Sequence, residues 1–105
     1  MGQFGIYQNK NALTKKAYPY LIDVQSSLLE SLGTRLVVPM TEKAHFSDKI
    51  IKELNPTIMI GGTEYTALVQ QMAAIKKENL GKAIGECINE RQLLLSAVDF
   101  LITGF

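Results

Sequence analysis

Few residues in this 105-residue chain are of types that carry out chemistry, and their spacing forms no catalytic set. His45 is the single histidine and Cys87 the single cysteine, and they lie far apart in the sequence. Neither has a companion at the spacing of a metal site, which needs three or four ligands. A Cys–His nucleophile pair is formally possible, but nothing in the sequence places the two together. We therefore expect no metal, no cofactor and no catalytic residue, and the chain is not predicted to be an enzyme.

Asp23 is the most unusual polar residue, because Ile22 and Val24 flank it inside a β-rich run. A general base at this position would need a partner acid, which the sequence does not offer. The favoured interpretation is a partly buried carboxylate that accepts hydrogen bonds from loop N–H groups or pairs with Arg35. The dipeptide Gly61-Gly62 lacks the lysine and the following helix of a phosphate loop, and it predicts a hairpin turn instead.

The elements that would position these residues are mainly β-strands. Their patterns of β-branched and apolar residues predict strands over residues 3–7, 20–25, 35–39, 57–60, 63–69 and 72–75. Pro39 is expected to end the third strand, because proline has no N–H for the ladder. The segments 8–17 and 76–86 are polar and are predicted to be loops, whereas residues 40–55 show no period that decides their structure.

The last part of the chain predicts an amphipathic helix. Asn89 is a candidate N-cap, and Gln92 three residues later would complete a capping box. The apolar arc of this helix is broader than one core-facing stripe needs, and the sequence closes on Gly104-Phe105. Such an arc favours a second buried surface, such as a dimer partner.

Composition narrows the class of protein. The formal net charge is +1 and basic residues occur at most in pairs, so direct nucleic-acid binding is not expected. No apolar stretch approaches the roughly 20 residues of a membrane span, and no signal-peptide pattern is present. A single cysteine fits a reducing compartment. We expect one cytoplasmic domain over residues 1–105.

Two blocks of sequence, Asp23-Val24-Gln25-Ser26 and Thr34-Arg35-Leu36-Val37-Val38-Pro39, resemble the CcdB family of plasmid-maintenance toxins. The resemblance runs from end to end in one register, with slippage only in regions 8–17 and 41–53. Further matching segments are Gln3-Phe4 with Tyr7, Leu54-Asn55-Pro56, Met72-Ala73 and the terminal Gly104-Phe105.

This resemblance implies a mainly β fold: an SH3-like barrel of the CcdB and MazF type, with a small additional sheet and one C-terminal α-helix. It also implies a homodimer that binds the A subunit of bacterial DNA gyrase. Proteins of this kind trap gyrase while its DNA is cleaved, so their action is not catalytic. A CcdA-like antitoxin with a disordered acidic tail neutralises them.

The resemblance also assigns residues to partners. The gyrase-binding surface of the family falls on Leu28 and Leu29 in a turn and on helix and tail residues Asp99, Ile102, Thr103, Gly104 and Phe105. Thr103 departs from the family pattern, which has an aromatic residue there that stacks on a gyrase arginine. An acidic antitoxin would favour basic residues, and the candidates are Lys10, Lys15, Lys16, Arg35, Lys43 and Lys49.

Two other functions stay open from the sequence. One is a ribonuclease toxin, because the related MazF and Kid toxins use the same barrel, and it would require a basic groove with an acid–base set. The other is an inactive family member that dimerises and binds antitoxin without poisoning gyrase, in which case Phe105 packs on its own dimer.

Overall fold

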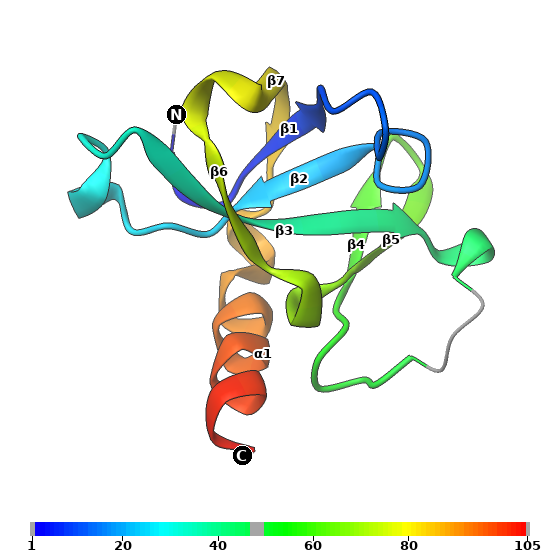
Figure 1. The fold of residues 1–105 in the computed structure, drawn as a ribbon. Coiled ribbons are helices and arrows are strands. Elements are labelled where there is room, and N and C mark those ends of the chain that lie inside the picture. Colours follow the sequence, from blue (N-terminus) through cyan, green and yellow to red (C-terminus); the bar gives the residue numbers. More distant parts are fainter. Residues whose placement is uncertain (1, 47–49, 105) are drawn as a thin grey trace.

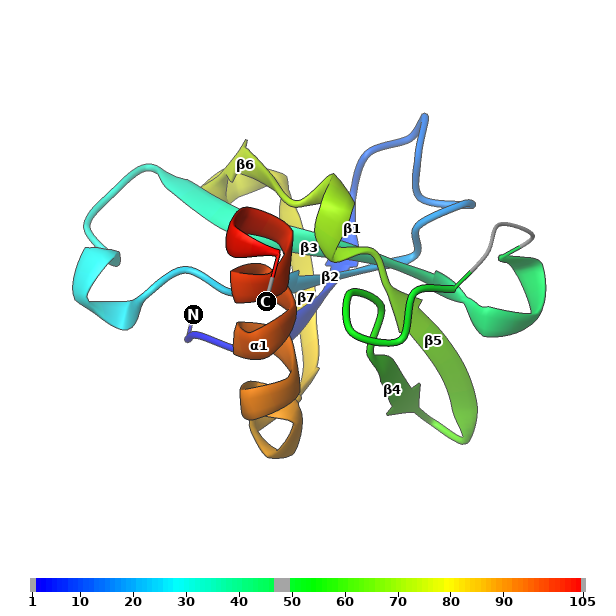
Figure 2. The same ribbon diagram turned by 90° about the horizontal axis from the view of Figure 1, so that it is seen from below.

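The computed structural model describes residues 2–46 and 50–104. One curled antiparallel sheet dominates it, and a single α-helix, α1 (Arg91–Thr103), packs on one face of that sheet (Figures 1 and 2). The expected mainly β fold with a C-terminal helix is confirmed. The strands are β1 (Gly5–Asn9), β2 (Tyr20–Asp23), β3 (Thr34–Glu42), β4 (Thr57–Ile60), β5 (Thr63–Ala67), β6 (Ala73–Lys76) and β7 (Leu80–Glu86).

Strand β3 organises the sheet, because it is nine residues long and pairs with three neighbours. On one side it pairs with β2, and the order continues through β1 to β7. On the other side its first half pairs with β6 and its second half with β5, which carries β4 at the edge. The β4–β5 hairpin and β6 are therefore joined to the main sheet through β3 instead of forming a separate layer.

Pro39 does not end β3, which continues to Glu42, so that expectation is wrong. The Pro39 carbonyl accepts a hydrogen bond from Leu68 N at 2.9 Å, on the side of β3 away from β2. In an antiparallel strand the N–H and C=O of one residue point to the same side. The missing N–H thus faces the gap between β6, whose pairing ends at Val37, and β5, whose pairing begins at Met40. No ladder donor is needed there.

The core has two parts, one on each face of the sheet, because successive strand residues point to opposite faces. The larger part contains Ile6, Ile22 and Val38, and the helix covers it with Leu94 and Ala97. The smaller part, on the other face, consists of Tyr7, Leu21, Val37 and Leu80, with Ile75 against them. Only Leu94 and Ala97 of α1 are fully buried, so the helix offers much of its apolar surface to solvent.

The connection between β6 and α1 differs from the sequence prediction. Residues 76–86 form a 3₁₀ turn, η4 (Lys77–Asn79), followed by strand β7, where a polar loop was expected. Gly81 is part of this strand for a steric reason: a Cβ there would lie 2.6 Å from the Gln8 carbonyl oxygen of β1. A glycine that looked like a loop residue thus allows β1 and β7 to approach closely.

The start of α1 also differs. Asn89 lies inside a 3₁₀ turn, η5 (Ile88–Glu90), whose Glu90 N–H donates to the Cys87 carbonyl. The helix begins at Arg91 with Glu90 as N-cap and without a side-chain capping hydrogen bond, so the expected capping box does not form. The Gln92 side chain instead contacts the Ser96 hydroxyl at 3.4 Å.

The hairpin between β4 and β5 is confirmed. Gly61 and Gly62 have φ values of 56° and 84°, which both glycines tolerate because they have no Cβ. In the segment 40–55, which the sequence left undecided, residues 40–42 complete β3 and the 3₁₀ turn η2 (Lys43–His45) follows. The small turn η1 (Ser27–Leu29) connects β2 to β3.

Candidate protein-binding site

The end of α1 exposes apolar side chains to solvent. Ile102 is 72% exposed and Leu101 is 40% exposed, and both belong to the last turn of the helix. Gly104 ends the helix in a left-handed conformation, with φ 80°, and its N–H donates to the Phe100 carbonyl at 2.9 Å. The end of the helix is thus well formed and leaves Ile102 free to contact a partner. Phe105 lies outside the described residues.

Two polar residues at this end, Thr103 and Asp99, differ in what their side chains contact. The Thr103 hydroxyl donates to the Asp99 carbonyl at 2.7 Å, so it satisfies the helix backbone. The Asp99 side chain is exposed one turn earlier on the same face. A carboxylate here is available to pair with a cation of a partner.

The turn between β2 and β3 forms the second exposed apolar segment. Leu28 is 91% exposed, Leu29 is 48% exposed and Leu32 is 47% exposed. Ser26 caps the η1 turn, because its hydroxyl accepts from Leu28 N at 3.2 Å and its carbonyl accepts from Leu29 N at 3.0 Å. The leucines therefore stand on an ordered turn and not on an unstructured loop.

The turn and the helix end do not form one patch within a single copy of the chain. Figures 1 and 2 show the turn, in cyan, projecting from one side of the sheet, and the end of α1, in red, lying apart from it in both views. A partner that contacts both segments would need to span the molecule, or two copies would need to bring the segments together.

Asp23 and Arg35 form the ion pair that the sequence offered as one alternative for this carboxylate, and Asp23 is fully buried instead of partly buried. Arg35 Nε donates to Asp23 Oδ2 at 2.8 Å, and both side chains are fully buried. The other carboxylate oxygen accepts from the Gln25 N–H at 3.0 Å. Arg35 therefore cannot be reached from the surface, so the prediction that it contacts an antitoxin is wrong. The sequence alone did not reveal that β3 turns this side chain inward.

The remaining basic candidates have varied surroundings. Lys15 and Lys16 are exposed, while the ammonium of Lys10 donates to the Glu78 carbonyl at 3.2 Å. Lys43 lies 3.9 Å from a Glu64 carboxylate oxygen, at an exposed site where such a pair is weak. Lys49 lies outside the described residues. Lys10, Lys15 and Lys16 all lie on the loop that joins β1 and β2.

That loop borders a cavity of about 360 Å³ beside the smaller core. Leu21, Val37 and Ile75 supply apolar lining, and the described residues of the polar lining include one ammonium group, Lys10, and no carboxylate. The cavity lies on the opposite face of the sheet from α1, because Leu21 and Val37 belong to the core on that face. It is therefore separate from the helix end.

The chemical groups that the sequence singled out are not assembled into an active centre. Burial raises the pKa of the Cys87 thiol to about 12, and its Sγ contacts the Phe4 carbonyl, so this thiol is not a nucleophile at neutral pH. His45 Nδ1 lies 3.1 Å from Glu42 Oε2 on the surface, far along the chain from Cys87. Within residues 2–46 and 50–104, no three His, Cys, Asp or Glu side chains gather as metal ligands would.

Comparison with known families gives a match over nearly the whole sequence. Residues 3–104 match the family described as CcdB protein. The chain belongs to the CcdB family. The resemblance seen in the sequence is thereby confirmed, and the chain is a CcdB-family toxin of a toxin–antitoxin module.

Among solved structures, this CcdB-family chain is similar to one described as an endoribonuclease in complex with its cognate antitoxin from Mycobacterial species. The TM-score is 0.76, and the match covers 97% of this chain and 94% of the other, at 12% sequence identity. At this identity the likeness shows a shared fold. In the described part of the chain, no helix has the length and apolar character needed to cross a membrane.

Sequence reasoning about this CcdB-family chain missed some exposed apolar residues. Leu32 extends the apolar surface of the turn, and Leu93, which is 58% exposed, lies on the outer side of α1. The broad apolar arc of the helix was a signal for Leu93. The sequence offered no comparable signal for Leu32, because only the structure shows that this residue is 47% exposed.

Proposed function

We propose that this chain binds the A subunit of bacterial DNA gyrase and traps the complex in which gyrase has cleaved DNA. Membership of the CcdB family supports the proposal. The observation that carries it is the exposure of Ile102 and Leu28, at 72% and 91%, at the two places where the family contacts gyrase. Exposed apolar side chains on ordered backbone typically mark a partner site.

The proposed action is binding and not catalysis. Burial of Ile102 and the turn leucines against gyrase would supply binding free energy without any chemical step in this chain. The Asp99 carboxylate would face a cation on gyrase, and such charged contacts are shorter and stronger than neutral ones. This contact would take over part of the role of the family aromatic that Thr103 replaces.

Two copies of the chain are part of the proposal. The turn and the helix end lie apart in one copy, whereas the family surface combines them. A homodimer with both segments near its axis would place Leu28 of one copy and Ile102 of either copy on one face. The incompletely buried arc of α1, with Leu101 and Leu93 exposed, is consistent with such an interface.

An antitoxin is the second proposed partner. The structurally similar endoribonuclease was solved with its cognate antitoxin. In this chain, an acidic tail would find Lys10, Lys15 and Lys16 on the loop beside the cavity of about 360 Å³, where the lining residues that the structure describes include no carboxylate. Charge complementarity of this kind favours rapid association.

The direct test measures binding of the purified chain to the purified gyrase A subunit by isothermal titration calorimetry. Heat release that saturates at a defined ratio of dimer to A subunit supports the proposal. A matched incubation with single-stranded RNA tests the ribonuclease alternative. Cleavage of RNA without binding to the A subunit would replace the proposal with that alternative, and the absence of both would indicate the inactive family member.

A further inference from the structure

The turn that carries Leu28 and Leu29 does not bury its own apolar side chains. No residue of η1 is buried, and the three leucines at positions 28, 29 and 32 all face solvent. Apolar burial is the dominant favourable term in folding, and η1 has no share in it. Here the shape of the turn must depend on hydrogen bonds to its backbone.

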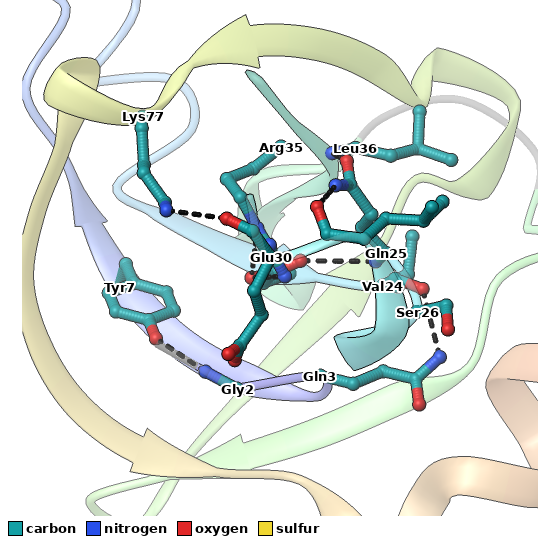
Figure 3. Close-up of polar contacts among 12 residues, drawn as sticks. Gly2, Gln3, Tyr7, Val24, Gln25, Ser26, Glu30, Arg35, Leu36 and Lys77 are labelled. Atoms are coloured by element: carbon teal, nitrogen blue, oxygen red, sulfur yellow. Dashed lines mark hydrogen bonds and ion pairs between the residues drawn. The ribbon is translucent and has the colours of Figure 1, made fainter. Parts of the chain in front are cut away.

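Two side chains outside this turn donate to consecutive carbonyls of it. Gln25 Nε2 donates to the Leu29 carbonyl at 3.0 Å, and Lys77 Nζ donates to the Glu30 carbonyl at 2.8 Å. The backbone N–H of Lys77 also donates to the Gly33 carbonyl at 2.9 Å, where the turn enters β3. Figure 3 shows Lys77 reaching across to Glu30 from the segment after β6.

Gln25 is itself fixed by the interior of the sheet. Its side-chain oxygen accepts from Leu36 N at 3.0 Å, as Figure 3 shows, and its own N–H donates to Asp23 Oδ1. The buried Arg35 guanidinium holds Asp23 in turn, through Oδ2. A continuous series of hydrogen bonds therefore runs from the buried ion pair through Gln25 to the carbonyl that follows Leu28.

We propose that Gln25 and Lys77 are positioning residues for gyrase recognition: they hold the 26–33 turn in the shape that presents Leu28 and Leu29. The inference rests on the proposed function. Holding the turn in advance lowers the conformational entropy that binding must otherwise remove. Neither side chain needs to touch gyrase for this effect.

Lys77→Met tests the proposal, because methionine keeps an unbranched apolar stem and removes the ammonium donor. Lys77 belongs to a surface turn, so the fold should persist in this variant. Gln25 is buried and accepts from Leu36 N of β3, so its substitution would also remove a hydrogen bond of that strand. We expect the affinity for the gyrase A subunit to fall roughly 2- to 10-fold, the effect of one hydrogen bond. The melting temperature should stay close to that of the wild type.

Two variants serve as controls. Lys76→Met removes the same charge from the neighbouring exposed residue, whose ammonium makes no hydrogen bond among the described residues, and should bind like the wild type. Lys77→Arg keeps a donor and should restore most of the affinity. Equal losses for Lys76→Met and Lys77→Met would indicate a general charge effect and overturn the proposal.

A double-mutant cycle separates positioning from direct contact. If Lys77 acts through the turn, Lys77→Met should have little further effect once Leu28 and Leu29 are both alanine. Additive losses would mean that Lys77 contacts gyrase itself. Hydrogen exchange at the Leu32 amide, which donates to the Leu29 carbonyl, should become faster in Lys77→Met.

Failure of the proposed function is visible separately, in the wild type. A wild-type chain that does not bind the A subunit overturns both proposals. A wild type that binds, together with Lys77→Met that binds equally well and shows unchanged exchange at Leu32, overturns the positioning role alone.

Discussion

Ile102→Ala is the substitution whose effect on the proposed gyrase binding follows most directly from the structure. The Ile102 side chain is 72% exposed, so about that share of its surface is still available for burial by a partner. Full burial of an isoleucine contributes about 1.5–3 kcal/mol, which leaves roughly 1–2 kcal/mol for the complex. Because 1.4 kcal/mol corresponds to a tenfold change, the affinity for the gyrase A subunit should fall about 5- to 30-fold per contacting copy.

The stability of the free protein should barely change, because Ile102 contributes little to the core. We expect the free energy of unfolding in urea to stay within about 0.5 kcal/mol of the wild type. Leu13→Ala is the matched control: Leu13 is 94% exposed, on the loop between β1 and β2, and its truncation should leave calorimetric gyrase affinity unchanged. The reasoning is refuted if Ile102→Ala binds like the wild type, or if Leu13→Ala weakens binding equally.

Three further predictions concern the helix end and the core. Thr103→Trp restores the family aromatic and should raise gyrase affinity by about 0.5–2 kcal/mol in calorimetry, the value of a cation–π contact; unchanged affinity would show that no gyrase cation lies there. Asp23→Asn leaves the buried Arg35 guanidinium without its counter-charge and should lower the free energy of unfolding by roughly 3–5 kcal/mol in urea, whereas a loss below about 1 kcal/mol would contradict the buried pair. The raised pKa of Cys87, about 12 against 9.0, means that the unfolded chain loses its thiol proton first, so this thiol should lower stability by about 1.4 kcal/mol per pH unit between pH 9 and 12. Urea denaturation of Cys87→Ala should lack this part of the pH dependence, and an identical pH profile in both proteins would contradict it.

The sequence predicted those parts of the fold that depend on local pattern. Alternating apolar residues predicted β1, a run of β-forming residues predicted β2, and two adjacent glycines predicted the β4–β5 turn. Strand β7 was missed because its side chains are almost all exposed and because Gly81 looks like a loop residue. Its glycine is required by the close approach of β1, a contact between distant segments that no local pattern reveals. The extension of β3 past Pro39 has the same origin, since it depends on where β6 ends and β5 begins.

The candidate site was predictable in its residues but not in its arrangement. The apolar arc near Ile102 and the paired leucines of the turn were visible in the sequence. Their separation within one copy was not, and neither was the burial of Arg35, because both depend on how the sheet curls. The role of Lys77 was hidden as well, since it contacts a carbonyl 47 positions away in the sequence.

The central claim, that this chain traps cleaved gyrase–DNA, is tested most directly by a gyrase cleavage assay. Purified chain, gyrase, ATP and supercoiled plasmid are incubated, and the DNA is then treated with detergent and protease to release protein from broken ends. The account predicts that linear plasmid accumulates with the wild type and much less with Ile102→Ala. Plasmid that stays unbroken with gyrases from several bacteria would contradict it.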